Sequence, residues 1–347
     1  MAGIPIPTAA RGRLAGVFAQ AGRVAGLLLV TLTLAPSARA QDAGWRIRLE
    51  PTYLDVHGHD QHVLTIHHVD AISVLDRKTA VALDTEAGTS YRAELRYTSG
   101  RWAWGTEFAW FQTKQASPDL ARSGAGGGDV VTFEVADREF TSTGPGEVVY
   151  FQVLEDTEVA LWTLDLFAER TLAASEGSHL ALRLGVRFGD FDNDYRVVAG
   201  LENTVGSRFD AESNYGRMTG PLVGMAGTVR IGRGSLEGYV GQSVILGEAA
   251  FNTQARDFTG PFGGSPTYVA EETFGRSGDV AIPITDLQAR GRYGLTEWLA
   301  LGVGVNAAAW WDVGVPPGVV PGAGGDQVLH ENTLVFFGLS GFVEFRF

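Results

Sequence analysis

Asn332–Phe347, with the sequence NTLVFFGLSGFVEFRF, is the stretch that decides how the rest of the chain is interpreted. Side chains alternate between the two faces of a β-strand. Counted back from Phe347, one face is apolar or glycine throughout, whereas the other face carries Arg346 and Glu344. A strand of a soluble sandwich is one reading of this pattern. An apolar face that ends on an aromatic residue is more typical of the lipid-facing strand that closes a membrane β-barrel.

The first forty residues have the features of a secretory signal peptide. Three arginines at 11, 13 and 23 precede an apolar segment at 24–35, and Ala38-Arg39-Ala40 is an A-x-A cleavage site. The apolar segment is too short for a spanning helix, although an N-terminal membrane anchor is the alternative. We therefore expect a cleaved signal peptide at 1–40 and a single barrel domain at 41–347.

Composition narrows the class of protein further. The whole chain has 27 basic and 40 acidic residues. The four arginines before residue 41 leave with the signal peptide, so the remainder carries 23 basic residues and a formal charge of −17. Such an acidic chain is not expected to bind nucleic acid phosphates. The absence of cysteine excludes disulfides and lipoprotein attachment. No apolar run near 18 residues follows position 41, which excludes a helical membrane protein but not a barrel.

Alternating segments recur along the chain in pairs. Four short turns and five long loops, at about 57–87, 114–157, 191–216, 249–279 and 314–331, join them in strict alternation. Outer-membrane barrels have this order, with short periplasmic turns, long extracellular loops and an even number of strands. Two further strand-like segments, at 130–140 and 148–154, are expected to project above the membrane; if they span it, the barrel has twelve strands. The ten predicted strands are Trp45–Leu54, Tyr91–Tyr97, Trp102–Phe111, Leu161–Glu169, Leu180–Phe188, Leu222–Ile231, Leu236–Leu246, Ile284–Tyr293, Trp298–Trp311 and Asn332–Phe347.

Tryptophan positions agree with a transmembrane up-and-down antiparallel barrel. Trp45, Trp102 and Trp298 fall at the predicted periplasmic strand ends, and three more fall near the extracellular ends: Trp110, Trp310 and Trp311. Two aromatic girdles are expected where a barrel meets the lipid headgroups. Ordinary core tryptophans of a β-protein are the alternative.

The polar faces of the predicted strands together form the barrel lumen. They are nearly neutral, so the acidic excess is expected in the loops. A barrel of about ten strands has little free lumen, and these side chains either form a polar plug of ion pairs or line a narrow aqueous path. The predicted lumen-lining residues are Arg46, Arg48, Glu50, Arg92, Glu94, Arg96, Glu107, Asp165, Glu169, Arg183, Arg187, Arg230, Glu237, Asp286, Arg290, Arg292, Glu344 and Arg346.

Metal and catalytic sites are not expected. Five of the seven histidines lie at 57–68, where His57-Gly58-His59-Asp60 has donors suited to a transition metal, but no fixed ligand spacing recurs. Asp190, Asp192 and Asp194 alternate as in Ca²⁺ loops but lack the glycine and distal glutamate of an EF-hand. No G-x-S-x-G motif occurs. We therefore predict no cofactor and no enzymatic activity and assign no metal-binding residues; the sequence leaves open whether the loop His57–His68 binds a metal.

Three stretches resemble the Legionella major outer membrane protein-like family. They are Leu83–Gly88 before the strand Tyr91–Tyr97, then Tyr215–Gly224, and finally Val280–Leu287 before the penultimate hairpin. The resemblance covers roughly the chain from residue 83 onward. It implies a porin-like outer-membrane barrel and no catalytic residues. The Legionella prototype is disulfide-linked, whereas this chain has no cysteine, so the resemblance does not extend to covalent oligomers.

The sequence thus predicts a protein of the Gram-negative outer membrane. The expected function is passive passage of small solutes or ions, or a structural surface barrel. The alternative is a binding or adhesion barrel whose loops at 114–157 and 249–279 carry the function. The expected partners are outer-membrane lipid, lipopolysaccharide and the barrel-assembly machinery, for which Phe347 is the predicted recognition residue. The pattern leaves the oligomeric state open.

Overall fold

The computed structural model describes residues 43–57, 62–70, 75–82, 84–85, 87–116, 120–123, 130–135, 138–142, 148–154, 158–175, 177–201, 205–260, 267–314 and 331–347. The predicted signal peptide at 1–40 lies outside these ranges. In the described ranges, no helix has the length and apolarity needed to cross a membrane.

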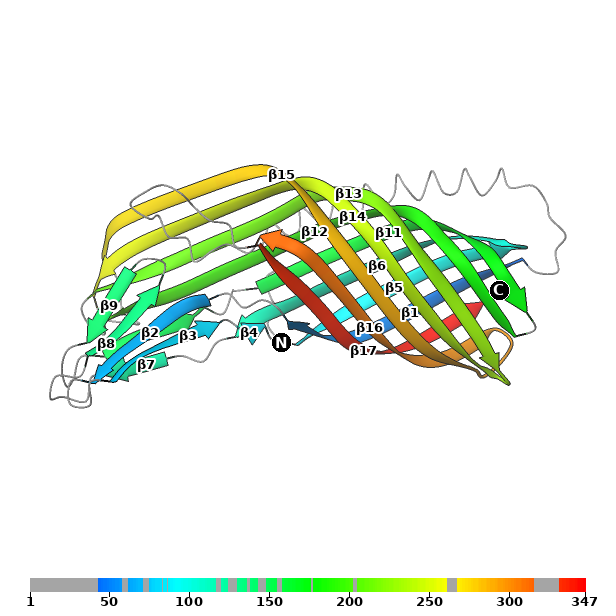
Figure 1. Cartoon of the computed structure of the whole chain (residues 1–347), viewed down its shortest axis with the longest axis horizontal. Helices are drawn as coiled ribbons and strands as arrows, with labels where there is room; N and C mark the ends of the chain where they lie inside the picture. The colour runs from blue at the N-terminus through cyan, green and yellow to red at the C-terminus, as the bar shows by residue number, and fades with distance from the viewer. Residues whose placement is uncertain are drawn as a thin grey trace, which may run out of the picture. The chain divides into compact units, whose positions relative to one another are not determined.

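The strands of Gly44–Phe347 form a closed antiparallel barrel (Figure 1). The ring order is β11-β6-β5-β1-β17-β16-β15-β14-β13-β12, and β12 pairs with β11 to complete it. The fold class and the ten-strand count predicted from the sequence are therefore confirmed. The barrel strands are β1 (Gly44–His57), β5 (Gly88–Ser99), β6 (Trp102–Ala116), β11 (Glu158–Ser175), β12 (Ser178–Leu201), β13 (Val205–Ile231), β14 (Gly234–Thr259), β15 (Thr267–Gly294), β16 (Leu299–Gly314) and β17 (Glu331–Arg346).

The first and last strands meet at the seam, as the closing-strand pattern predicted. Ile47 pairs with Phe345, and Arg48 pairs with Glu344. At the end of this ladder, the backbone N–H of Trp45 donates to the Phe347 carbonyl and the Phe347 N–H donates to the Trp45 carbonyl, each at 3.0 Å. The ring therefore has no open edge along this seam, which removes the edge-strand liability of an open sheet.

The two extra strand-like segments do not enter the barrel ring. β8 (Val130–Val135) and β9 (Arg138–Ser142) form a four-stranded sheet with β2 (His62–Asp70) and β3 (Leu75–Ala82). β10 (Val148–Val153) pairs with the last residues of β12 and with β7 (Leu120–Ser123), while β4 (Asp84–Thr85) adds to the end of β6. The count is therefore ten and not twelve.

Four barrel strands are much longer than the sequence pattern indicated. β12 to β15 have 24 to 28 residues each, whereas a tilted strand needs about 9–11 residues to cross a bilayer. Two segments expected to be loops, 191–216 and 249–279, are largely paired strand. We call the end from which these strands project the loop end, and the opposite end, with the four short connections, the turn end. The prediction of long loops was therefore wrong for 191–216 and 249–279, which are mostly parts of the long strands.

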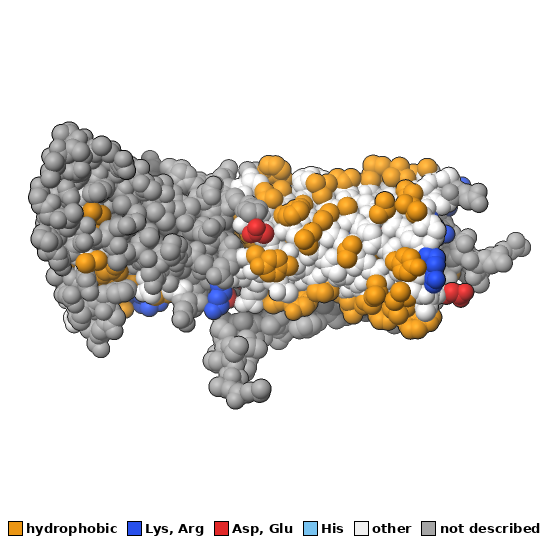
Figure 2. All heavy atoms as spheres, turned by 90° about the horizontal axis from the view of Figure 1, so that it is seen from below, with side chains coloured by type: hydrophobic (Ala, Val, Ile, Leu, Met, Phe, Trp, Pro, Cys, Tyr) orange, Lys and Arg blue, Asp and Glu red, His pale blue; other side chains and the backbone are white. Residues whose placement is uncertain are grey.

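The polarity of the two faces reverses along these long strands, as β14 shows. From Leu236 to Leu246 the outward side chains are mainly apolar and exposed. Hydrophobic side chains are likewise spread over the face of the barrel that Figure 2 shows. Beyond that point the outward positions are mainly polar, with Glu248, Asn252, Gln254 and Arg256 around Ala250, whereas the inward side chains are mainly apolar. An exposed apolar band that stops at one level on a barrel is the surface expected in contact with lipid.

Two register shifts of the long strands lie at the level where the apolar band ends. The β12–β13 register shifts between Gly189 and Phe191, and the β13–β14 register shifts between Gly216 and Thr219. Arg217 has a left-handed φ of 58° within the second shift, which is uncommon outside glycine. Bulges bend a strand and increase its twist. They therefore mark the place where the long strands leave the barrel wall.

The turn-end aromatic girdle is present, and the loop-end one is only partly as predicted. The rings of Trp45 and Tyr97 lie 4.9 Å apart, and Trp298 stacks on Phe345 at 6.5 Å. At the other end Trp311 is exposed on the outside, but Trp310 is only 2% exposed and points inward. The assignment of Trp310 to a lipid-facing girdle was wrong, because strand alternation on β16 turns Trp310 inward with Ala300 and Asn306 and leaves only Trp311 outside.

Candidate functional site

The barrel interior near the turn end is a layer of ion pairs built around Glu344. This carboxylate is fully buried and accepts from three guanidinium groups, those of Arg48 at 2.6 Å, Arg292 at 2.8 Å and Arg346 at 2.8 Å. Glu344 lies on the polar face of the closing strand β17, where strand alternation turns it inward. Because a buried charge is costly without partners, the three arginines explain how this acid is tolerated inside the barrel.

Arg187 is the centre of the next group along the barrel axis. Its Nε and Nη2 atoms donate to the two oxygens of Asp165, each at 2.7 Å, in a bidentate pair. Its Nη1 atom donates to Asp286 at 2.6 Å and to the hydroxyl of Ser243 at 3.2 Å. All four side chains are buried. Such forked pairs hold a guanidinium in one orientation, so Arg187 ties β12 to β11, β14 and β15.

Arg183 is held by both charge and aromatic rings. Its guanidinium donates to Glu169 at 2.7 Å, and its Cζ atom lies 3.9 Å from the Phe167 ring centroid and 4.4 Å from that of Tyr239. Glu169 also pairs with Arg96 of β5 at 2.6 Å. Stacking on two rings desolvates the cation while keeping it stabilised. This group therefore fixes the interior side of the β11–β12 hairpin.

Several of these contacts cross the lumen between strands that are not neighbours in the ring. Arg48 of β1 donates to Glu237 of β14 at 2.5 Å, although β15, β16 and β17 separate the two strands in the ring. Gln288 of β15 donates to Glu107 of β6 at 3.4 Å across the same interior. Contacts of this kind occupy the lumen instead of lining its wall.

The structure can be set against the eighteen predicted lumen residues one by one. Arg230 is the exception, because it lies exposed at the turn end of β13, where the strand runs out of the packed interior. The other residues all take part in ion pairs within 4 Å inside the barrel: Arg46, Arg48, Glu50, Arg92, Glu94, Arg96, Glu107, Asp165, Glu169, Arg183, Arg187, Glu237, Asp286, Arg290, Arg292, Glu344 and Arg346.

Neutral side chains complete the charged layer. Glu50 pairs with Arg290 at 2.8 Å and accepts from the Ser340 hydroxyl at 2.7 Å and from the Asn306 amide at 2.8 Å. The Asn306 oxygen in turn accepts from Arg92 at 3.0 Å. Ser340 and Asn306 are not among the predicted lumen residues, all of which are charged, although each lies at an inward position of its strand.

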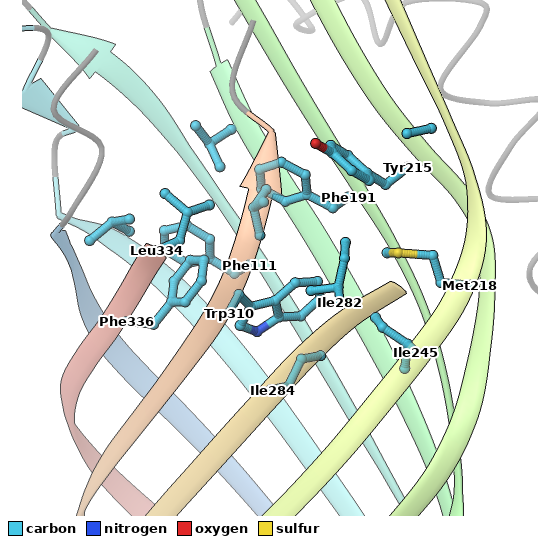
Figure 3. Close-up of a cluster of buried hydrophobic side chains, with 14 of the residues drawn as sticks. Phe111, Phe191, Tyr215, Met218, Ile245, Ile282, Ile284, Trp310, Leu334 and Phe336 are labelled. Atoms are coloured by element: carbon cyan, nitrogen blue, oxygen red, sulfur yellow. The ribbon is translucent and has the colours of Figure 1, made fainter. Parts of the chain in front are cut away.

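An apolar layer closes the interior above the ion pairs, and the sequence reasoning missed it. Aromatic rings contact one another in a chain from Phe111 on β6 through Phe336, Trp310 and Phe191 to Tyr215 on β13, with centroid distances between 5.5 and 6.3 Å (Figure 3). Trp310 on β16 and Phe191 on β12 come from strands that β13, β14 and β15 separate in the ring, so the layer spans the lumen. Phe336 shares the face of Glu344, and Phe111 shares that of Glu107, so strand parity was the available signal.

A small cavity lies between the two layers. Its volume is about 60 Å³, and it is bordered by Arg92, Glu107 and Asp286 from the charged layer and by Trp310 and Phe336 from the apolar layer. A space of this size takes a few water molecules. It does not accommodate a sugar or an amino acid.

The structure describes the side chains of only one of the two weak metal motifs. His57–Asp60 lies outside the residues whose side chains the structure describes. Asp192 accepts a hydrogen bond from Asn214, and Asp194 lies 3.9 Å from Arg196. Over the described ranges, no group of three histidine or acidic side chains has an arrangement suited to a metal ion.

The fold and the interior together define the chain as a ten-stranded β-barrel of the outer-membrane type. Its sequence matches no protein-family model and no curated protein. Among solved structures, it is similar to the outer membrane protease OmpT of Escherichia coli, with 11% identity, a TM-score of 0.44, and coverage of 90% of this chain and 99% of that one.

Two further solved structures are more distant. The Pseudomonas putida toluene transporter TodX has 9% identity and a TM-score of 0.28, with coverage of 91% of each chain. The anion-selective porin of Comamonas acidovorans has 9% identity and a TM-score of 0.15, with coverage of 87% of this chain and 100% of that one. At these scores the likenesses carry no argument about function.

Proposed function

We propose that this protein is a sealed outer-membrane barrel that anchors extended β-structure at the cell surface. The observation that carries the proposal is the filled interior, in which a charged layer and an apolar layer both span the lumen. Of the two functions expected from the sequence, this interior favours a structural surface barrel over passive passage of solutes. The proposal includes no enzymatic activity.

The energetics of opening support this choice. A solute path would require separating cross-lumen pairs such as Arg48–Glu237 and Arg187–Asp286, together with the ring contacts of Trp310. Separating one buried ion pair costs about 3–5 kcal/mol. Opening a path through both layers would require breaking several such contacts at once. The free-energy cost is therefore too high for an open path to be populated often enough for steady passive diffusion.

Orientation and partners are part of the same proposal. The turn end faces the periplasm and the long strands β12 to β15 project outward, because barrels of this type keep their short connections on the periplasmic side. Outer-membrane lipid and lipopolysaccharide surround the apolar band, and the barrel-assembly machinery inserts the chain. A place in the Legionella major outer membrane protein-like family is proposed on the sequence resemblance. Phe347, the proposed recognition residue, is 73% exposed and paired through its backbone to Trp45.

Planar-bilayer recording of the purified barrel tests the sealed interior. The wild-type protein is expected to insert without steady conductance at either polarity. Combined replacement of Arg48, Arg187 and Trp310 by alanine removes the cross-lumen pairs Arg48–Glu237 and Arg187–Asp286 and the ring contacts of Trp310. This variant is expected to produce channel events, which would show that insertion is detectable. Trp311→Ala is the matched control, since it removes the neighbouring ring on the outside. A stable conductance step from the wild-type protein would show that the barrel is a porin.

A binding function at the loop end is the second candidate, favoured by the length of β12 to β15. Joining Asn193 to Ser213 and Thr253 to Phe274 through two-residue turns removes the projecting parts at paired positions of the ladders. The shortened barrel is expected to keep its heat-modifiable migration on gels. Cells that display it should lose attachment to surfaces if the projecting strands carry adhesion, and equal attachment of cells with the full and shortened proteins would reject this function.

A further inference from the structure

The outer surface of the barrel at the turn end carries a group of exposed arginines. Arg101 lies in the β5–β6 turn, Arg170 on the outward face of β11, and Arg233 in the β13–β14 turn. Arg230 is also exposed at this end. Among the described residues on the outside of the turn end, Glu297 is the one acid. This basic rim contrasts with the acidic chain as a whole, whose formal charge is −13, and basic side chains are visible at that end of the barrel (Figure 2).

Arg101, Arg170 and Arg233 lack carboxylate partners, as do two other exposed arginines of the described residues, Arg217 and Arg230. Within the described part of the chain, no acid lies within ion-pair distance of Arg101, Arg170 or Arg233. Three arginines farther toward the loop end are paired on the outer face: Arg196 with Asp194 at 3.9 Å, Arg208 with Asp210 at 3.0 Å and Arg256 with Glu271 at 3.9 Å. The interior arginines are paired as well. The turn-end arginines are thus available to an external anion.

Their height along the barrel is set by aromatic rings. The Cζ atom of Arg170 lies 5.6 Å from the ring centroid of Trp102, and that of Arg233 lies 5.7 Å from that of Tyr293. Arg233 also donates to the Leu295 carbonyl at 2.8 Å. Tryptophan and tyrosine at the edge of an apolar band sit at the level of the lipid headgroups. A guanidinium held over such a ring is therefore placed beside headgroup phosphates, which it matches with two parallel hydrogen bonds.

We propose that Arg101, Arg170 and Arg233 form a belt that binds the phosphate groups of anionic phospholipids in the leaflet at the turn end. The apolar band beside the belt supplies the surface for the acyl chains: Leu172, Ile231 and Leu236 are all exposed there. The belt depends on the barrel spanning a membrane and is independent of whether the interior is sealed. Because the belt lies at one end of the barrel, its binding to lipid headgroups in one leaflet would fix how deep the barrel sits in the membrane.

Native mass spectrometry of the full chain in micelles with equal phosphatidylglycerol and phosphatidylcholine tests the belt. The wild-type barrel is expected to retain phosphatidylglycerol preferentially. An arginine near an anionic surface contributes about fivefold in binding. The triple variant Arg101→Gln, Arg170→Gln, Arg233→Gln should therefore lower the preference by about tenfold or more. Heat-modifiable migration confirms that each variant is folded.

The matched control is Arg196→Gln, Arg208→Gln, Arg256→Gln, which removes the same charge from the loop end. This variant is expected to keep the lipid preference of the wild type. The belt is rejected if the turn-end variant keeps the preference, or if both triple variants lose it equally, because net charge alone would then explain it. Displacement of the bound lipid by millimolar inorganic phosphate would also reject it, since the arginines would then form a site for free phosphate.

Discussion

Replacing Arg187 by methionine tests how much the interior network stabilises the barrel. Methionine keeps much of the side-chain volume but removes four hydrogen bonds, three to the carboxylates of Asp165 and Asp286 and one to Ser243. Both acids stay buried without their cation. Removing one partner of a buried pair costs about 3–5 kcal/mol, and two acids are orphaned here, so we expect a loss of at least about 3 kcal/mol in the free energy of unfolding.

Urea unfolding of the barrel in lipid vesicles, followed by tryptophan fluorescence, measures this loss. The second variant, Arg187→Met with Asp165→Asn and Asp286→Asn, removes the uncompensated charges as well. It is expected to recover most of the lost stability, because neutral groups of similar shape replace the ion pairs. A loss below about 1 kcal/mol for Arg187→Met would refute a tightly packed charged layer. Further destabilisation by the two asparagines would show that the cost does not come from unpaired carboxylates.

Two further predictions concern the wall of the barrel. A Cβ atom at Gly302 would overlap the Phe342 ring and the Gly291 carbonyl oxygen, whereas one at Gly341 meets open space. Gly302→Val should therefore destabilise the barrel by about 1–3 kcal/mol in urea unfolding, and an equal effect of Gly341→Val would contradict this packing. Leu339 is 65% exposed within the apolar band and Val269 is 62% exposed at the loop end. Leu339→Arg should lower stability in vesicles by about 2–4 kcal/mol, with little change for Val269→Arg; similar costs at both positions would place the lipid boundary elsewhere.

The sequence predicts the part of the fold that lies in the apolar band. There, lipid outside and charge inside make the two faces chemically opposite, so the alternation from Leu236 to Leu246 is unambiguous. Above Leu246 the outward residues become polar, and the Asp-, Asn- and Gly-rich segments resemble loops although they are paired strands. These strands are held together by backbone hydrogen bonds, which do not depend on side-chain hydropathy and so cannot be predicted from it.

Strand alternation predicts which side chains point into the barrel, but it does not predict which of them contact one another. Strand alternation turns Arg187 and Glu344 inward, but it does not say that Arg48 reaches Glu237 across the lumen, because that depends on the tilt and closure of the ring. The apolar layer was overlooked because the strand faces that carry Phe111 and Phe336 also carry charged residues and were therefore interpreted as polar along their whole length. Trp310 was misplaced for a third reason, since it was assigned by its level near the strand end, whereas strand alternation turns it inward with Asn306.

The seam between β1 and β17 has a consequence for how the barrel is made. It joins residues almost a whole chain apart, and Arg48–Glu344 and Glu50–Ser340 bridge it from the inside. Neither bridge exists until the last strand is in place, so every earlier intermediate has two bare strand edges and several unpaired interior charges. Long-range pairing of this kind is slow to form. Closure is therefore expected to be the final and cooperative step, in which the ring and its charged interior form together.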